Sequence, residues 1–156
     1  MPKQVMTRRA SDNEYLHRDF HGALSTGIDY LDQRYGPEAV HEYLRRFVNT
    51  FYAPLKADLR RRGLVALKEH FERLYETEGG EASITLAGEE LILRVAACPA
   101  VTHMRSRGYT VARLFGETTR IVNEALCEGS DFAAELVEYD DETGRSVQRF
   151  YRRKAQ

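Results

Sequence analysis

Residues 78–99, EGGEASITLAGEELILRVAACP, decide the fold, because the hydrophobic pattern changes its period inside this stretch. Gly79-Gly80 ends the helical spacing that precedes it, since paired glycines destabilise a helix. After it, 83–86 and 91–95 flank the turn Ala87-Gly88-Glu89, which is typical of a β-hairpin. Alternation along the second strand predicts one face with Leu91, Leu93, Val95 and Ala97, and another with Ile92, Arg94, Ala96 and Cys98.

Upstream of this stretch the spacing is helical. Asp12 is a suitable helix cap, and a face with steps of three and four residues leads from it to Gly36-Pro37: His17, His21, Leu24, Ile28, Leu31 and Tyr35. A second helix, which Pro54 interrupts, has the inward positions Val40, Leu44, Phe47, Val48 and Phe51. A short continuation over 53–62 and a third helix over 64–77 complete the first half.

Downstream, helical pieces over 99–107 and 116–128 precede a second hairpin, formed by 132–139 and 146–152. This order predicts an α+β fold, in which N-terminal helices pack on one face of a four-stranded antiparallel sheet made of two hairpins. We expect residues 1–12 to be a flexible N-terminal segment and residues 13–156 to be one domain, because no internal linker divides them.

Composition excludes several classes of protein. The chain has 156 residues, 42% hydrophobic and 30% charged, with a formal net charge of −1, so nothing attracts it globally to nucleic acid or to an anionic membrane. It contains no apolar run long enough to span a bilayer and no apolar core of a signal peptide near its start. The two cysteines, Cys98 and Cys127, are too few for a disulfide scaffold, which favours a cytoplasmic protein with free thiols.

The first candidate motif is YLHRDFH, residues 15–21. His17 and His21 stand at i and i+4 on one helical face, a spacing that can place two imidazoles on one metal ion. The commoner explanation of a bare HxxxH motif is two partly buried histidines bonded to backbone or carboxylate groups. Arg18 and Asp19 fall off this face and are expected in solvent, as are His41 and His70 on later helices.

The second candidate is CPAVTH, residues 98–103, where the chain leaves a strand and enters a helix. Amides at a helix start lower a thiol pKa, so Cys98 is a candidate nucleophile with His103 as its base. The two side chains also suit zinc. A buried structural cysteine and a surface histidine are the alternative.

A third candidate lies on the predicted helix 116–128. Arg120 could hold a substrate carboxylate, with Glu117 or Glu124 as an acid or base and Asn123 beside them. An exposed ladder of ion pairs is the commoner explanation of this spacing. If the first helix packs over the end of the sheet, His17, His21, Cys98 and His103 meet in one site. His17, His21 and Cys98 would then bind a divalent transition metal such as zinc.

Several stretches resemble the L-2-amino-thiazoline-4-carboxylic acid hydrolase-like family: YLHRDFHGALSTGIDYLDQRYGPEAVHEYLRRF, FYAPL, CPAVTHMR and ETTRIVNEAL. The resemblance extends from about Asn13 to Arg152, and the Cys-Pro corner is its most specific part. It implies that water opens a small ring containing sulfur and nitrogen, with Cys98 the first position to carry over. The predicted layout is also similar to that of 4-vinyl reductase-type small-molecule-binding domains.

Three functions remain open from the sequence. The first is a hydrolase that opens a C–N bond in a thiazoline- or amidine-like ring, using Cys98, His103 and His21, with Arg120, Glu117 and Asn123 binding the substrate. The second is a non-catalytic sensor or accessory domain that binds a small molecule or a metal, and the spread of aromatic residues favours it. The third is a structural protein that forms homo-oligomers through its first two helices.

Overall fold

Four helices precede the first strand in the structure, a computed structural model that describes residues 18–155. They are α1 (Phe20–Tyr35), α2 (Pro37–Phe51), α3 (Ala53–Arg62) and α4 (Leu64–Glu78). Pro54 lies in the first turn of α3, where its missing N–H costs nothing, so it separates α2 from α3 as predicted. Gly79, in the left-handed conformation with φ +74°, ends α4 at the predicted break.

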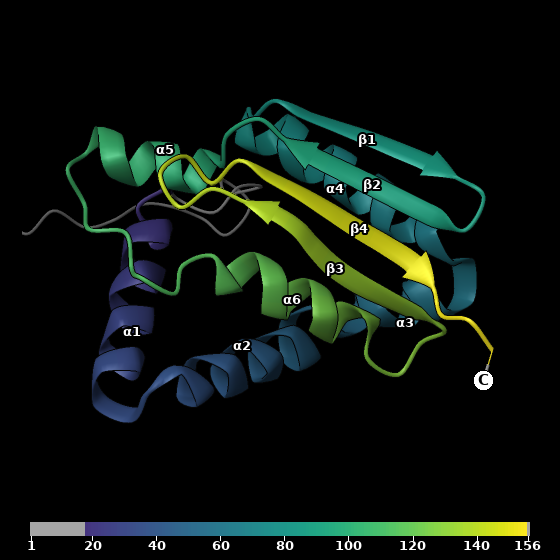
Figure 1. Ribbon diagram of the computed structural model, residues 1–156, viewed down its shortest axis with the longest axis horizontal. Helices are drawn as coiled ribbons and strands as arrows, with labels where there is room; N and C mark the ends of the chain where they lie inside the picture. The colour runs from purple at the N-terminus through teal and green to yellow at the C-terminus, as the bar shows by residue number, and fades with distance from the viewer. Residues whose placement is uncertain (1–17, 156) are drawn as a thin grey trace, which may run out of the picture.

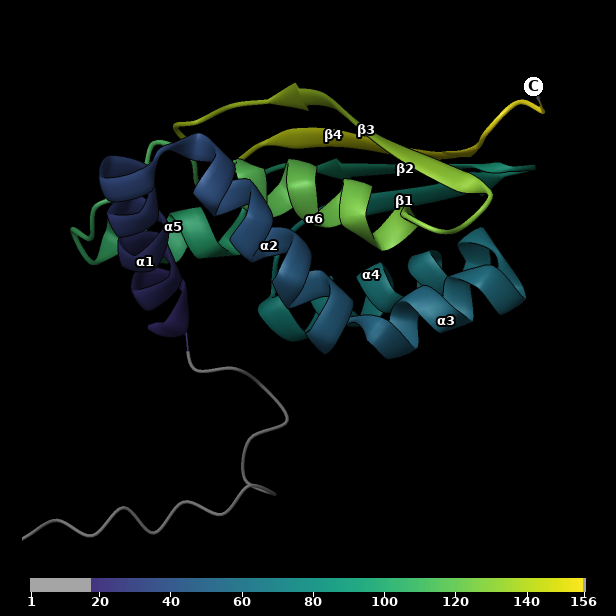
Figure 2. The same cartoon turned by 90° about the horizontal axis from the view of Figure 1, so that it is seen from below.

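The second half of the described chain contains β1 (Ala82–Ala87), β2 (Glu90–Val95), α5 (Pro99–Ser106), α6 (Glu117–Cys127), β3 (Phe132–Tyr139) and β4 (Ser146–Arg152). The strands form one antiparallel sheet in the order β1-β2-β4-β3. The predicted α+β class is confirmed, and the four strands are the two predicted hairpins, joined through β2 and β4. Figure 1 shows the hairpins side by side, and Figure 2 shows the helices beneath one face of the sheet.

Two groups of buried side chains hold these layers together. Beneath the sheet, Leu91 and Leu93 of β2 and Phe150 of β4 pack against Leu67 and Phe71 of α4. A second group gathers residues of α1, α2, α5, α6 and the segment between α5 and α6: Ile28, Val40, Leu44, Ala100, Val101, Met104, Ala112, Phe115 and Ile121. A large apolar side chain contributes about 1.5–3 kcal/mol to the stability of the fold when it is fully buried. The buried apolar faces of α5 and α6 therefore hold these two helices in place.

Some predicted inward positions are wrong. Phe47 and Phe51 of α2 are 37% and 59% exposed, and Tyr35 at the end of α1 is 64% exposed. The buried face of α2 is narrower than predicted, since only Val40, Leu44 and Val48 are buried on that helix.

The first helix was predicted to begin after Asp12, and the described residues before Phe20 are not helical. Within the described chain, α1 begins at Phe20, and Arg18 and Asp19 form a turn before it. Asp12, His17 and the segment 1–12 lie outside the described residues. Among the helices of residues 18–155, none is both long and apolar enough to cross a membrane.

Candidate functional site

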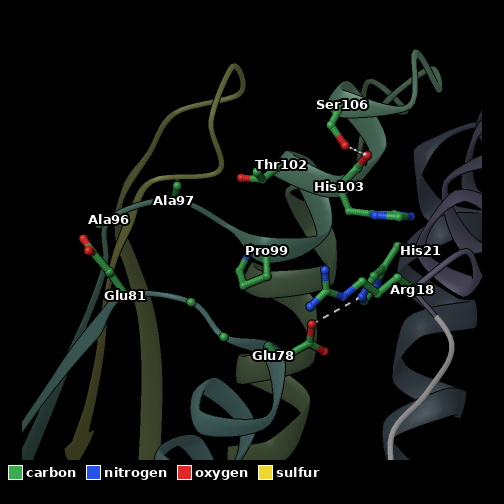
Figure 3. A pocket seen from close by; sticks show the side chains of 12 residues that line it. Arg18, His21, Glu78, Glu81, Ala96, Ala97, Pro99, Thr102, His103 and Ser106 are labelled. Carbon is green, nitrogen blue, oxygen red and sulfur yellow. Dashed lines mark hydrogen bonds and ion pairs between the residues drawn. The ribbon is translucent and has the colours of Figure 1, made fainter.

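A cleft of about 350 Å³ lies where the start of α1, the end of α4, the segment after β2 and one side of α5 meet. Figure 3 shows its side chains approaching from these different elements. The lining residues are Arg18, His21, Glu78, Gly79, Gly80, Glu81, Ala96, Ala97, Pro99, Thr102, His103 and Ser106. Its volume and its mixture of polar and apolar walls suit a small molecule.

The first polar pair in the cleft is His21 with Glu78. His21 stands in the first turn of α1, and its Nε2 lies 3.6 Å from Glu78 Oε2 at the end of α4, with both side chains largely buried. This distance is too long for a good hydrogen bond, and His21 Nε2 is sealed from solvent without a hydrogen-bond partner in the described structure. A buried polar atom without a partner costs about 1–3 kcal/mol, so this nitrogen is suited to a group that a bound molecule would bring.

The second polar pair is His103 with Asp19. His103 Nε2 lies 3.1 Å from Asp19 Oδ1, and the Tyr109 hydroxyl donates to the same oxygen at 3.4 Å. The rings of His103 and Tyr109 meet edge to face with centroids 6.2 Å apart. Asp19 therefore fixes the orientation of an imidazole that comes from α5, as a carboxylate does for a histidine that moves protons.

His21 and His103, predicted to share a site, do line the same cleft. Arg18 joins them, and in Figure 3 its side chain reaches toward Glu78 beside His21. Arg18 and Asp19 are exposed, as predicted, but they also contribute to the site, because Arg18 lines the cleft and Asp19 contacts His103. The position of Asp19 just before α1 gave no signal of this contact, since its partner is 84 residues away.

Cys98 does not line the cleft, although its neighbours Ala97 and Pro99 do. The thiol is largely buried, and the backbone N–H of Cys98 donates to Thr143 O at 2.9 Å in the turn between β3 and β4. Burial raises the pKa of Cys98, although the amides of Val101 and Ala100 act in the opposite direction. The predicted lowering of this pKa is therefore wrong: desolvation of the thiolate outweighs the start of α5.

The predicted substrate-binding residues on α6 do not line the cleft either. Glu117 Oε2 lies 2.7 Å from His41 Nε2, and Arg120 binds Glu117 and also Glu124, the latter at 3.3 Å. The carboxylate of Glu117 raises the pKa of Arg120. Arg120 and Glu117 are thus engaged with each other and with α2, which matches the alternative of an ion-pair ladder.

Asn123, the third of these residues, is buried beneath the sheet. Its Nδ2 donates to Gln148 Oε1 at 2.7 Å, and Gln148 Nε2 donates to Ser146 Oγ at 2.9 Å. This bonded chain ties α6 to β4, so the amide of Asn123 serves the core.

His41 and His70, which were assigned no role from the sequence, were predicted to lie in solvent, and this prediction is wrong. The side chain of His41 is 16% exposed and contacts Glu117. His70 packs edge to face against Tyr52 and Phe71, and burial, with a smaller effect of Arg73, lowers its pKa to about 4. Both were misjudged because neighbouring helices cover faces that looked polar.

No metal site can be assembled from the described part of the chain. Between residues 18 and 155, no three His, Cys, Asp or Glu side chains are grouped closely enough to hold a metal ion. The predicted triad of His17, His21 and Cys98 includes a residue outside that range, and Cys98 does not line the cleft that contains His21.

Comparison with known proteins adds no identity to this geometry. No protein-family model matches the chain, and a search of the curated proteins also finds no match.

Proposed function

We propose that this protein is a small-molecule hydrolase that opens a C–N bond in a thiazoline- or amidine-like ring by direct attack of water in the cleft. One observation carries the proposal: two imidazoles, His21 and His103, line one small cleft, and each lies against a carboxylate. Hydrolysis of such a ring needs one group that accepts a proton and one that donates a proton near neutral pH, and histidine suits both roles.

The bond changes follow from these roles. His103, held through Nε2 by Asp19, takes a proton from water through Nδ1 as the water oxygen adds to the ring carbon between its heteroatoms. His21, with Glu78 beside it, gives the proton on Nε2 to the ring nitrogen, which supplies the hydrogen-bond partner that this atom lacks. The C–N bond then breaks as His103 gives its proton to the departing nitrogen and His21 takes the proton of the new hydroxyl group. The oxygen of the water ends as a carbonyl, the nitrogen leaves as an amine with two new protons, and both histidines return to their starting protonation states.

Arg18 replaces Arg120 as the proposed anchor for a substrate carboxylate, because Arg18 lines the cleft and Arg120 is bound to glutamates elsewhere. Cys98 is not a nucleophile in this proposal. Its raised pKa and its position outside the cleft lining both favour water as the attacking group.

The test is turnover of 2-amino-thiazoline-4-carboxylate, the ring named by the family resemblance, followed by chromatography and mass spectrometry in ¹⁸O-labelled water. One labelled oxygen in the product is expected. His21→Gln and His103→Gln should each lower kcat by about 10²–10⁴, the usual contribution of a general acid or base. His41→Gln is the matched control, since His41 also faces a glutamate but lies outside the cleft.

Two outcomes would overturn the proposal. Loss of activity in a folded Cys98→Ser variant, with His21 and His103 dispensable, would return the chemistry to a thiol nucleophile. Saturable binding without product, for this compound and its amidine analogues, would instead favour the non-catalytic sensor.

A further inference from the structure

The inference concerns β1, which forms one edge of the sheet (Figure 1). Ala96 N donates to Glu81 O at 3.0 Å, just beyond the paired residues Ala82 and Val95. Hydrogen-bonded pairs alternate along an antiparallel ladder, so the bonds to β2 come from Ser83 and Thr85. The backbone N–H and C=O groups of the alternate residues Ala82, Ile84 and Leu86 therefore point to the free side of β1.

The two edges of the sheet differ in how they discourage pairing. β3, the other edge, has a register shift between Leu136 and Glu138, and it carries Glu135 and Glu138. Bulges and charged side chains are the features that keep edge strands from pairing with other chains. β1 has the sequence ASITLA, without a charge, a proline or a register shift, and no strand within residues 18–155 pairs with its outer side, so this side is suited to pairing with another strand.

The helix beside this edge adds a charge pattern. A groove of about 280 Å³ between α4 and β1 is lined by Glu72, Tyr75, Glu76, Gly80, Ala82 and Ile84. The chain reverses at Gly79-Gly80, so α4 runs antiparallel to β1. Four residues of a helix span about 6 Å, and two residues of a strand span about 6.6 Å. Every fourth residue of α4 therefore lies beside every second residue of β1: Glu76 beside Ala82, Glu72 beside Ile84 and Lys68 beside Leu86.

We propose that β1 pairs with β1 of a second copy of this chain, antiparallel about a two-fold axis at Ile84, to form one continuous eight-stranded sheet. Ala82 would lie opposite Leu86 of the other copy, and the exposed groups of the two edges would form about six backbone hydrogen bonds. The interface is isologous, as most homodimer interfaces are.

Charge complementarity favours a second copy over an unrelated extended peptide. The same two-fold axis passes beside Glu72, so it brings Lys68 of each copy toward Glu76 of the other. Lys68 and Glu76 carry opposite charges at equal offsets from Glu72, whose carboxylate Lys68 already binds within its own chain. A peptide with charges of one sign only would be attracted by one of these two residues and repelled by the other.

The first test measures the mass of the full chain by sedimentation equilibrium from micromolar to millimolar concentration. A dimer is expected, with amide hydrogen exchange of Ala82, Ile84 and Leu86 slowing as the dimer forms. Ala82→Pro removes one donor from the free edge and keeps the ladder to β2, so it should yield a folded monomer. Phe47→Glu, which changes an exposed aromatic on α2, should leave the dimer intact.

A charge exchange provides the second test. Lys68→Glu and Glu76→Lys should each raise the dimer dissociation constant about two- to thirtyfold, because each variant breaks two symmetry-related exposed ion pairs. The double variant should return to within about twofold of the wild type. The two residues lie two helical turns apart in one chain and do not face each other there, so direct contact between chains is the expected source of such a rescue.

Three results would overturn this proposal. A monomer at every concentration would do so, as would additive effects of the two charge variants without rescue. A dimer that survives Ala82→Pro and dissociates on Phe47→Glu would place the interface on α2 instead.

Discussion

Gly144→Ala should destabilise the protein by forcing apart the turn between β3 and β4 and the start of α5. Gly144 has φ +69°, and a Cβ built on it would lie 2.3 Å from Cys98 Cβ and 3.2 Å from Val101 Cγ2. The left-handed backbone costs an alanine about 1 kcal/mol, and overpacking a filled interior costs about 1–3 kcal/mol. We expect a total loss of about 3 kcal/mol in the free energy of unfolding.

Thermal unfolding followed by circular dichroism measures this loss. For a domain of this size, 1 kcal/mol corresponds to about 2–4 °C, so Tm should fall by about 6–12 °C. Gly88→Ala is the matched control, because Gly88 also has a positive φ, +58°, but a Cβ there meets nothing within 4 Å. It should lose only the backbone strain, about 1 kcal/mol or about 2–4 °C.

A double-mutant cycle locates the clash. Cys98→Gly removes the Cβ that the methyl group added by Gly144→Ala would strike, so it should recover at least about 1 kcal/mol of the loss. Cys98→Ser keeps that Cβ and should recover nothing. Equal losses in Gly144→Ala and Gly88→Ala would refute the close approach of this turn to Cys98.

Three further predictions concern buried groups. Burial lowers the pKa of His70 from the ordinary value of 6.5 to about 4, so the unfolded chain binds more protons than the folded one between these pH values. Unfolding in urea should therefore show a free energy of unfolding about 2 kcal/mol lower at pH 5 than at pH 7. His70→Gln should lose that pH dependence, and an unchanged slope would contradict the burial. Asn123→Leu leaves Gln148 Oε1 without its donor and should cost about 2 kcal/mol; a loss below about 0.5 kcal/mol would mean that another donor serves it. Alkylation of Cys98 by iodoacetamide, followed by peptide mass spectrometry, should be slow and still rising above pH 9.0, whereas a plateau below that pH would indicate an activated thiolate.

Much of the secondary structure followed from local sequence. Leu91, Leu93 and Val95 alternate with the less buried Ile92 and Arg94 and do face the helices, because the period of a strand is fixed by its backbone. Pro54 and Gly79 ended helices where expected, since their effects act within one turn. The burial of Phe47 and Phe51 was misjudged because the width of the buried face of α2 depends on which helices pack against it.

The site was less predictable than the fold. His21 and His103 were recognised by their chemistry, yet their partners Glu78 and Asp19 carried no signal in the sequence. Cys98 was placed correctly at a corner before a helix, and its pKa was wrong because the sequence does not show which atoms cover a thiol.

The sequence by itself determined the order of helices and hairpins, the break at Gly79-Gly80 and the set of residues able to exchange protons, because these depend on backbone preferences and side-chain chemistry within a few residues. Only the tertiary structure decided that β2 pairs with β4, that His21 and His103 line one cleft while Cys98 does not, and that Arg120 is bound by glutamates. Those outcomes depend on contacts between residues far apart in the chain, where packing and desolvation, and not local preference, determine the free energy.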